Sequence, residues 1–111
     1  MSDKEIEIPF TSDELISYSK QNSSTLIVIN FKAIWCKPCK AIKPFIDYLK
    51  DSYPNVEFYE IDISDDSRDT IISYFNIIKV PTCVFYKNGN LCNTLIGTDQ
   101  NKLEELVNEY L

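Results

Sequence analysis

Apolar residues form two kinds of segment, which take turns along the chain. Short runs rich in β-branched and aromatic residues predict strands, some of them buried on both faces. These runs cover residues 26–31, 56–63, 83–86 and 91–96. Segments whose apolar residues lie three or four positions apart predict amphipathic helices. They cover residues 12–21, 40–53, 64–75 and 99–110. A further short edge strand is expected where Ile6 and Ile8 alternate with glutamates, just before Pro9.

The predicted elements follow one another in the order βαβαβαββα. Strand–helix–strand units pair their strands in parallel, because the helix returns the chain to the same end of the sheet. Asn88-Gly89 lies between the last two strands and is a strong hairpin signal, which adds an antiparallel edge. The pattern therefore predicts an α/β fold with a mixed five-stranded sheet flanked by four helices, built as a single domain over residues 1–111.

Composition narrows the class of protein. The chain has 111 residues, 44% hydrophobic and 25% charged, which is enough for one domain with its own core. A net charge of −6 argues against nucleic-acid binding, since the phosphate backbone would repel the domain. No apolar run reaches membrane-spanning length and no leader pattern is seen, so we expect no membrane segment and a cytoplasmic protein. The sequence contains no histidine, which excludes hydrolases with a catalytic imidazole.

The candidate chemistry lies in Cys36 and Cys39, two cysteines three positions apart between a buried strand and a helix. Residues at this spacing lie on one side of a helix start, close enough to form a disulfide. Free backbone N–H groups there, together with Lys37 and Lys40, stabilise a thiolate, which is the reactive form. Pro38 suits the first helical turn and stiffens the loop. The pair is therefore a candidate redox centre.

The two cysteines are expected to differ in role. Cys36, at the helix start, attacks a substrate disulfide and forms a mixed disulfide. Cys39, one turn deeper and expected to be the more buried, then attacks Cys36 and releases the reduced substrate. Two other interpretations are a zinc site completed by Cys83 and Cys92, and two inert core cysteines. The close spacing usual in zinc ligand pairs is missing between Cys83 and Cys92.

Residues 35–40, around the pair, have the sequence Trp-Cys-Lys-Pro-Cys-Lys. This motif resembles the signature Trp-Cys-Gly-Pro-Cys-Lys of the thioredoxin family. Val80 and Pro81 before the fourth strand, and Gly97 after the fifth, match the same family pattern. The resemblance implies that Pro81 is a cis proline against the disulfide and that the Val80 backbone pairs with an extended substrate peptide. It also implies a substrate-docking surface made by Trp35, Pro81 and Gly97.

The same resemblance implies the activity. It implies a protein-disulfide reductase that carries electrons on its own dithiol and needs no cofactor. Thioredoxin reductase or an equivalent protein would be the electron donor, protein disulfides the substrates, and the expected state is a monomer. Two alternatives stay open: a thioredoxin-fold binding or regulatory subunit of a larger assembly, and an oxidant or isomerase that uses the same dithiol.

Three departures from the family pattern bear on the mechanism. Asn30 stands where thioredoxins usually have a buried aspartate beneath the cysteines, and an amide cannot accept the proton of Cys39. Lys37 replaces the usual glycine and is expected to make the disulfide more oxidising. Lysines near the motif predict a basic patch that would attract acidic partners. They are Lys32, Lys37, Lys40, Lys43 and Lys79.

Overall fold

The computed structural model describes residues 11–111. Over these residues the helices are α1 (Ser12–Gln21), α2 (Lys37–Ser52), α3 (Asp69–Tyr74) and α4 (Gln100–Tyr110). The strands are β1 (Ile27–Lys32), β2 (Glu57–Asp62), β3 (Thr82–Lys87) and β4 (Asn90–Ile96). A short 3-10 helix, Asp66–Arg68, leads into α3. The predicted succession of elements from the first helix onward is therefore confirmed.

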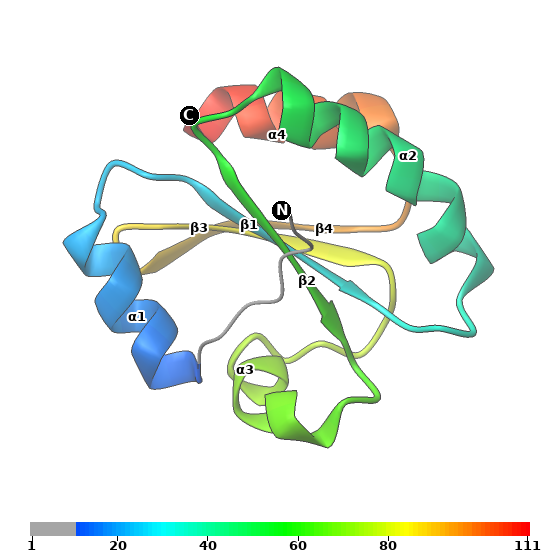
Figure 1. Cartoon of the computed structure of the whole chain (residues 1–111), viewed down its shortest axis with the longest axis horizontal. Helices are drawn as coiled ribbons and strands as arrows, with labels where there is room; N and C mark the ends of the chain where they lie inside the picture. Colours follow the sequence, from blue (N-terminus) through cyan, green and yellow to red (C-terminus); the bar gives the residue numbers. More distant parts are fainter. Residues whose placement is uncertain (1–10) are drawn as a thin grey trace.

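The described strands form one mixed sheet in the order β2-β1-β3-β4. β1 and β2 run parallel, while β3 is antiparallel to both of its neighbours. Helices α2 and α4 cover one face of the sheet, and α1 and α3 cover the other (Figure 1). The α/β architecture is as predicted, with a sheet of four strands rather than five in the described part of the chain. The fifth predicted strand, at Ile6 and Ile8, lies outside the described residues.

β1 is a central strand, and its side chains enter a core on each face of the sheet. Val28 belongs to an apolar cluster with Ile42 of α2, on the face that α2 and α4 cover. Ile29 belongs to a second cluster with Leu15 of α1 and Ile71 of α3. Successive side chains of a strand point to opposite faces, so a strand between two helical layers is apolar at most of its positions. This explains why the apolar run predicted β1 correctly.

Local signals place the helix ends and the hairpin. Thr11 Oγ1 accepts the backbone N–H of Glu14 at 3.2 Å, and the Glu14 carboxylate accepts the N–H of Thr11 at 2.9 Å, which completes a capping box. The side chain of Asp99 caps α4. Asn88 and Gly89 have φ values of 53° and 74°, the left-handed conformation that a tight hairpin requires. These contacts set where α1 and α4 begin and where β3 turns into β4.

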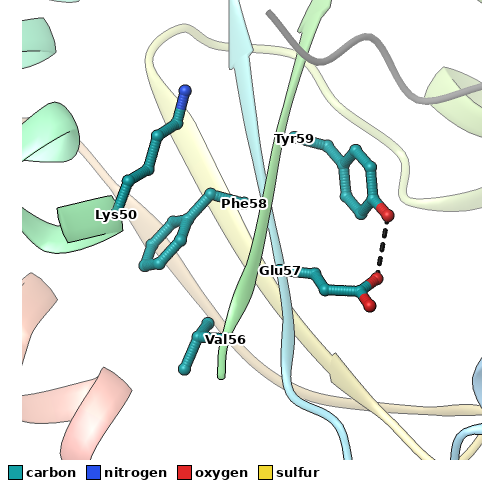
Figure 2. Close-up of a pocket in the computed structure, with 5 residues that line it drawn as sticks. All are labelled: Lys50, Val56, Glu57, Phe58 and Tyr59. Atoms are coloured by element: carbon teal, nitrogen blue, oxygen red, sulfur yellow. Dashed lines mark hydrogen bonds between the residues drawn. The ribbon is translucent and has the colours of Figure 1, made fainter. Parts of the chain in front are cut away.

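β2 forms an open edge of the described sheet, since its strand neighbour there is β1 alone. A pocket of about 250 Å³ lies beside it, lined by Lys50, Val56, Glu57, Phe58 and Tyr59. Figure 2 shows Phe58 and Lys50 on one side of the strand and Glu57 and Tyr59 on the other. On that second side the Tyr59 hydroxyl donates a hydrogen bond to Glu57 at 2.8 Å. Side chains from both faces of β2 therefore line this pocket.

Candidate active site

The two cysteines lie where β1 leads into α2. The helix begins at Lys37, directly after Cys36, as the cysteine motif predicted; the apolar period starts only at residue 40, because the first turn is polar. Cys36 is the N-cap residue, and its Sγ accepts the backbone N–H of Cys39 at 3.1 Å. Pro38 lies in the first turn, where its missing N–H costs no helical hydrogen bond. The helix thus starts on the cysteine motif itself and aims a backbone donor at the sulfur of Cys36.

A disulfide joins Cys36 to Cys39, with the two Cα atoms 5.3 Å apart. Both cysteines are buried, with 4% and 5% of their surface exposed. The expectation that Cys39 is the more buried is therefore wrong for this oxidised state, because the disulfide holds both sulfurs in one small apolar cluster. Ala33 completes that cluster, and Val80 packs against it. The difference between the cysteines lies in hydrogen bonding to the helix start and not in depth.

Trp35 lies on the surface next to the disulfide, with 70% of its area exposed. Ile34, its neighbour in the chain, is 74% exposed, and Ile78, two residues before Val80, is 79% exposed. Large apolar side chains that remain exposed beside a reactive group are typical of a surface that another molecule covers. The position of Trp35 is that expected of a docking residue rather than of a core aromatic.

The loop before β3 reaches the same site. The peptide bond between Val80 and Pro81 is cis, as the resemblance implied. The backbone N–H of Gly97 donates to the carbonyl of Pro81 at 3.0 Å, which ties the end of β4 to this loop. Gly97 has a φ of 108°, and a Cβ added there would meet no atom within 4 Å. Glycine is thus required for the backbone conformation, and it leaves open space beside Pro81.

Asn30 is buried in β1, with 5% of its surface exposed. Its Oδ1 accepts a hydrogen bond from Sγ of Cys83, its partner in the pairing of β1 with β3, at 3.6 Å. Cys83 belongs to the apolar cluster under α2 and α4. Burial raises the pKa of Cys83 to about 12, so this cysteine is a protonated donor at neutral pH. The amide of Asn30 is therefore engaged with a thiol that does not take part in the disulfide.

The predicted basic patch is smaller than the sequence indicated. Lys32 Nζ lies 2.6 Å from a carboxylate oxygen of Glu60, and Lys43 lies 3.1 Å from Asp47 and 3.5 Å from Glu60. Burial raises the pKa of Glu60, but the hydrogen bond from Lys32 and the neighbouring lysine charges outweigh it and lower the pKa overall. Ion pairs thus neutralise part of the patch. The lysines of the patch without an ion pair within residues 11–111 are Lys37, Lys40 and Lys79.

A pocket beside Cys39 was missed by the sequence analysis. Its volume is about 240 Å³, and its lining residues are Lys32, Ala33, Ile34, Cys39, Lys40, Lys43 and Asp62. Asp62 is the last residue of β2 and pairs in register with Lys32. Its Oδ1 accepts the backbone N–H and the hydroxyl of Ser64 at 2.9 and 2.7 Å. No spacing in the sequence relates Asp62 to the cysteines; the parallel pairing of β1 with β2 brings them to one pocket.

Neither a metal cluster nor a membrane helix is present in residues 11–111. The disulfide already uses both sulfurs that the zinc interpretation needs, and no three potential metal ligands gather in this part of the chain. None of its helices is both long and apolar enough to span a bilayer.

The thioredoxin family model matches residues 9–109 of the chain. The chain belongs to the thioredoxin family. It is 36% identical to the thioredoxin of Sus scrofa over 108 residues, which cover 97% of this chain and 98% of that protein. It is 43% identical to the thioredoxin of Ophiophagus hannah over 88 residues, 79% of this chain and 82% of that one. The X-ray structure of Fasciola hepatica thioredoxin is similar with a TM-score of 0.83 at 29% identity, covering 96% of this chain and 100% of that one.

Family membership and the disulfide together establish the chemistry. This thioredoxin-family protein is a thiol-disulfide oxidoreductase, an enzyme of a family that acts on protein disulfides. Its redox-active pair is Cys36 and Cys39, at the position of the family motif. Trp35, whose indole is exposed, directly precedes Cys36 in the chain. The cis peptide bond between Val80 and Pro81 lies beside the pair in space, since Val80 packs against the cysteine cluster.

Proposed function

We propose that the protein reduces disulfides of client proteins, with Cys36 as the attacking thiolate and Cys39 as the resolving thiol. The position of Cys36 at the start of α2 carries this proposal. Its sulfur accepts the N–H of Cys39 at 3.1 Å and lies at the positive end of the helix dipole. In the reduced protein the same donor and dipole stabilise a thiolate at Cys36, with the charges of Lys37 and Lys40 nearby.

The proposed cycle transfers two electrons to the client. The thiolate of Cys36 attacks one sulfur of the client disulfide, which forms a mixed disulfide and expels the first client thiolate. Cys39 then loses its proton and attacks the sulfur of Cys36, which expels the second client thiolate. The product is the Cys36–Cys39 disulfide seen here. The dithiol carries the electrons itself, so the cycle needs no bound cofactor.

The client-docking surface in this proposal lies over Trp35, Val80, Pro81 and Gly97. An extended client segment lies against the exposed indole and pairs with the backbone of Val80 as an added strand. Support comes from the 70% exposure of Trp35 and from the packing of Val80 against the cysteine cluster. The open space at Gly97 leaves room for the client backbone. In this proposal Lys37 and Pro38 form the first turn of α2, and Asn30, in the strand that precedes the motif, is a supporting residue of the site.

The partners follow from the same proposal. The electron donor is thioredoxin reductase or an equivalent protein, which reduces the disulfide after each cycle, and the chain works as a monomer in the cytoplasm. The lysines without an ion pair attract acidic clients or donors, and salt limits the range of this attraction to about 10 Å. A rate of client reduction that falls with added salt supports this attraction, whereas a rate independent of salt contradicts it.

We also propose that the fifth predicted strand, at Ile6 and Ile8, pairs with β2 along its open edge. The sequence alternates apolar and acidic side chains over residues 5–8, as an edge strand requires. Within residues 11–111 the strand neighbour of β2 is β1 alone, and side chains from both faces of β2 line the adjacent pocket. Removal of residues 1–10 tests this: the backbone amides of Glu57–Asp62 should then exchange with deuterium faster than in the full chain. Unchanged exchange would contradict the fifth strand.

Reduction of insulin disulfides tests the activity. With a thiol donor present, the chain should precipitate reduced insulin, and Cys36→Ser should abolish this reaction. Cys39→Ser should instead accumulate the mixed disulfide. A protein that served only as a binding or regulatory subunit would act no faster than its Cys36→Ser variant. Equilibration with glutathione gives the reduction potential, which separates a reductase from an oxidant or isomerase.

A further inference from the structure

The resolving step requires Cys39 to lose its proton, and Asn30, a buried polar residue of β1, cannot accept it. Asn30 has an amide with no basic atom. Its Oδ1 already accepts the thiol of Cys83 at 3.6 Å, and burial raises the pKa of that thiol to about 12. Asn30 and Cys83 therefore both stay neutral at the pH where thiols react. The proton must leave by another route.

The pocket beside Cys39 offers that route. Its volume of about 240 Å³ is enough for several water molecules, at roughly 30 Å³ each. Polar groups from three elements face it: Lys32 from β1, Lys40 and Lys43 from α2, and Asp62 from β2. Water needs polar partners to be held in such a site, and these side chains supply them. The pocket therefore connects Cys39 with solvent through groups that bind water.

Asp62 is the carboxylate of this pocket. The hydroxyl and the backbone N–H of Ser64 bind its Oδ1 and lower the pKa of Asp62, so it is an anion whenever the thiols react. Its Oδ2 has no hydrogen bond from residues 11–111 and can accept one from water. The other nearby acids are engaged elsewhere. Glu60 is bonded to Lys32 at 2.6 Å, and Asp65 accepts from Ser67 at 3.0 and 2.6 Å.

We propose that the proton of Cys39 leaves through water in this pocket, and that Asp62 holds and polarises the accepting water. The inference rests on the proposed roles of Cys36 and Cys39. As the S–H bond of Cys39 breaks, a pocket water takes the proton and passes it to solvent. The sulfur of Cys39 bonds to that of Cys36, and the client thiolate leaves. Asp62 is a positioning residue, since it acts on the thiol through water, and the ammonium of Lys40 stabilises the developing thiolate.

Asp62→Asn tests this assignment because asparagine keeps an oxygen for the Ser64 hydrogen bonds. The reduced protein is mixed with an aromatic disulfide that releases a coloured thiolate at each step. The first release reports attack by Cys36 and should be unchanged. The second release reports the resolving step and should slow roughly tenfold at neutral pH, with a steeper rise toward alkaline pH. Acetate at constant ionic strength should partly restore it, as a small carboxylate that the lysines of the pocket attract.

Asp65→Asn is the matched control. Asp65 lies three residues after Asp62, is exposed, and also accepts hydrogen bonds from a serine, Ser67. It does not line the pocket. Both releases should match wild type, with no response to acetate. A second release that is unchanged in Asp62→Asn, or that acetate accelerates equally in all three proteins, would overturn the inference. Loss of the first release in wild type would instead contradict the role of Cys36. Asp62→Glu, which keeps the carboxylate, should retain most of the second rate even if Asp62→Asn lowers thermal stability.

Discussion

Cysteine occurs in two different settings in this protein, one at a helix start and one inside a sheet. Cys36 begins α2, where its sulfur accepts a backbone N–H at 3.1 Å and lies in the helix dipole. Cys83 lies inside β3, where its sulfur is surrounded by apolar side chains and the oxygen of Asn30 is its polar partner. Both are buried to a similar degree, at 4% exposed each. Exposure therefore does not explain why the two thiols differ in reactivity. The hydrogen-bond donors and charges around each sulfur explain it.

Cys92, like Cys83, is a free cysteine on a strand. It lies on β4 and is half-buried, and its sulfur donates to the carbonyl of Asn90 at 3.8 Å. Burial raises the pKa of Cys92, although the charge of Lys87 opposes the effect. A strand offers a thiol no run of unpaired N–H groups, whereas a helix start offers several. The fold thus confines thiolate chemistry to one end of α2.

Selective alkylation should show the largest difference between the two settings. In the reduced protein at pH 7, iodoacetamide should modify Cys36 at least about a thousandfold faster than Cys83, because the thiolate is the reacting form. The rate at Cys83 should rise about tenfold per pH unit up to its pKa of about 12, since each unit below that value reduces the thiolate fraction tenfold. Mass spectrometry of the quenched peptides measures both rates.

Unfolding provides the control for this experiment. In concentrated urea both cysteines should react at similar rates, because the helix start and the apolar cluster are both lost. If Cys83 reacted as fast as Cys36 in the folded protein, the distinction between the two settings would be wrong.

The sequence predicted the elements of both settings, because each has a local cause. The apolar runs marked β1 and β3, and the Cys-x-x-Cys motif with Pro38 marked the start of α2. The apolar periodicity alone starts at residue 40, three residues after the helix begins, so the motif and not the periodicity located the start of α2. The disulfide followed from spacing alone, whereas the cis bond at Pro81 followed only from family resemblance.

Contacts that depend on strand register could not be predicted. The bond between Lys32 and Glu60 and the placement of Asp62 beside Cys39 both result from the pairing of β1 with β2. The hydrogen bond from Cys83 to Asn30 results from the pairing of β1 with β3. A single sequence fixes which face of a strand is apolar, but not which residue lies opposite. Hence the sequence predicts a larger basic patch than the structure has, and it does not predict the pocket beside Cys39.

Asn30→Asp should give the next largest effect, because it introduces a carboxyl group at the buried position that is hydrogen-bonded to Cys83. We expect a buried carboxylate at this position of β1 to accept the proton of Cys39, so the resolving step should accelerate roughly tenfold at neutral pH. Its pH profile should gain a second ionisation, that of the new acid. The aromatic-disulfide assay measures this, and an unchanged profile would contradict an influence of Asn30. Asp62→Asn should matter less in this background, since the proton then has a second acceptor.

Replacement of Cys83 should change stability and leave activity intact. Cys83→Ala removes a buried sulfur and leaves Oδ1 of Asn30 without its donor, which should cost about 1–2 kcal/mol of unfolding free energy. Urea titration measures this cost, and the rate of insulin reduction should stay that of wild type. Cys92→Ala, at a half-buried site, should change the unfolding free energy by less than about 0.5 kcal/mol. Loss of insulin reduction in folded Cys83→Ala would show that the strand setting takes part in redox chemistry.

Lys37→Gly should give the smallest effect, and it separates side-chain charge from backbone donors at the helix start. The side chain of Lys37 is exposed and has no ion pair within residues 11–111, so water screens much of its field at Cys36. The backbone N–H of Cys39 and the dipole of α2 remain in the variant. We therefore expect a reduction potential lower by only about 10–20 mV, where about 30 mV corresponds to 1.4 kcal/mol. Equilibration with glutathione measures it. An equal or higher potential would mean that Lys37 does not stabilise the thiolate, and that the backbone alone distinguishes Cys36 from Cys83.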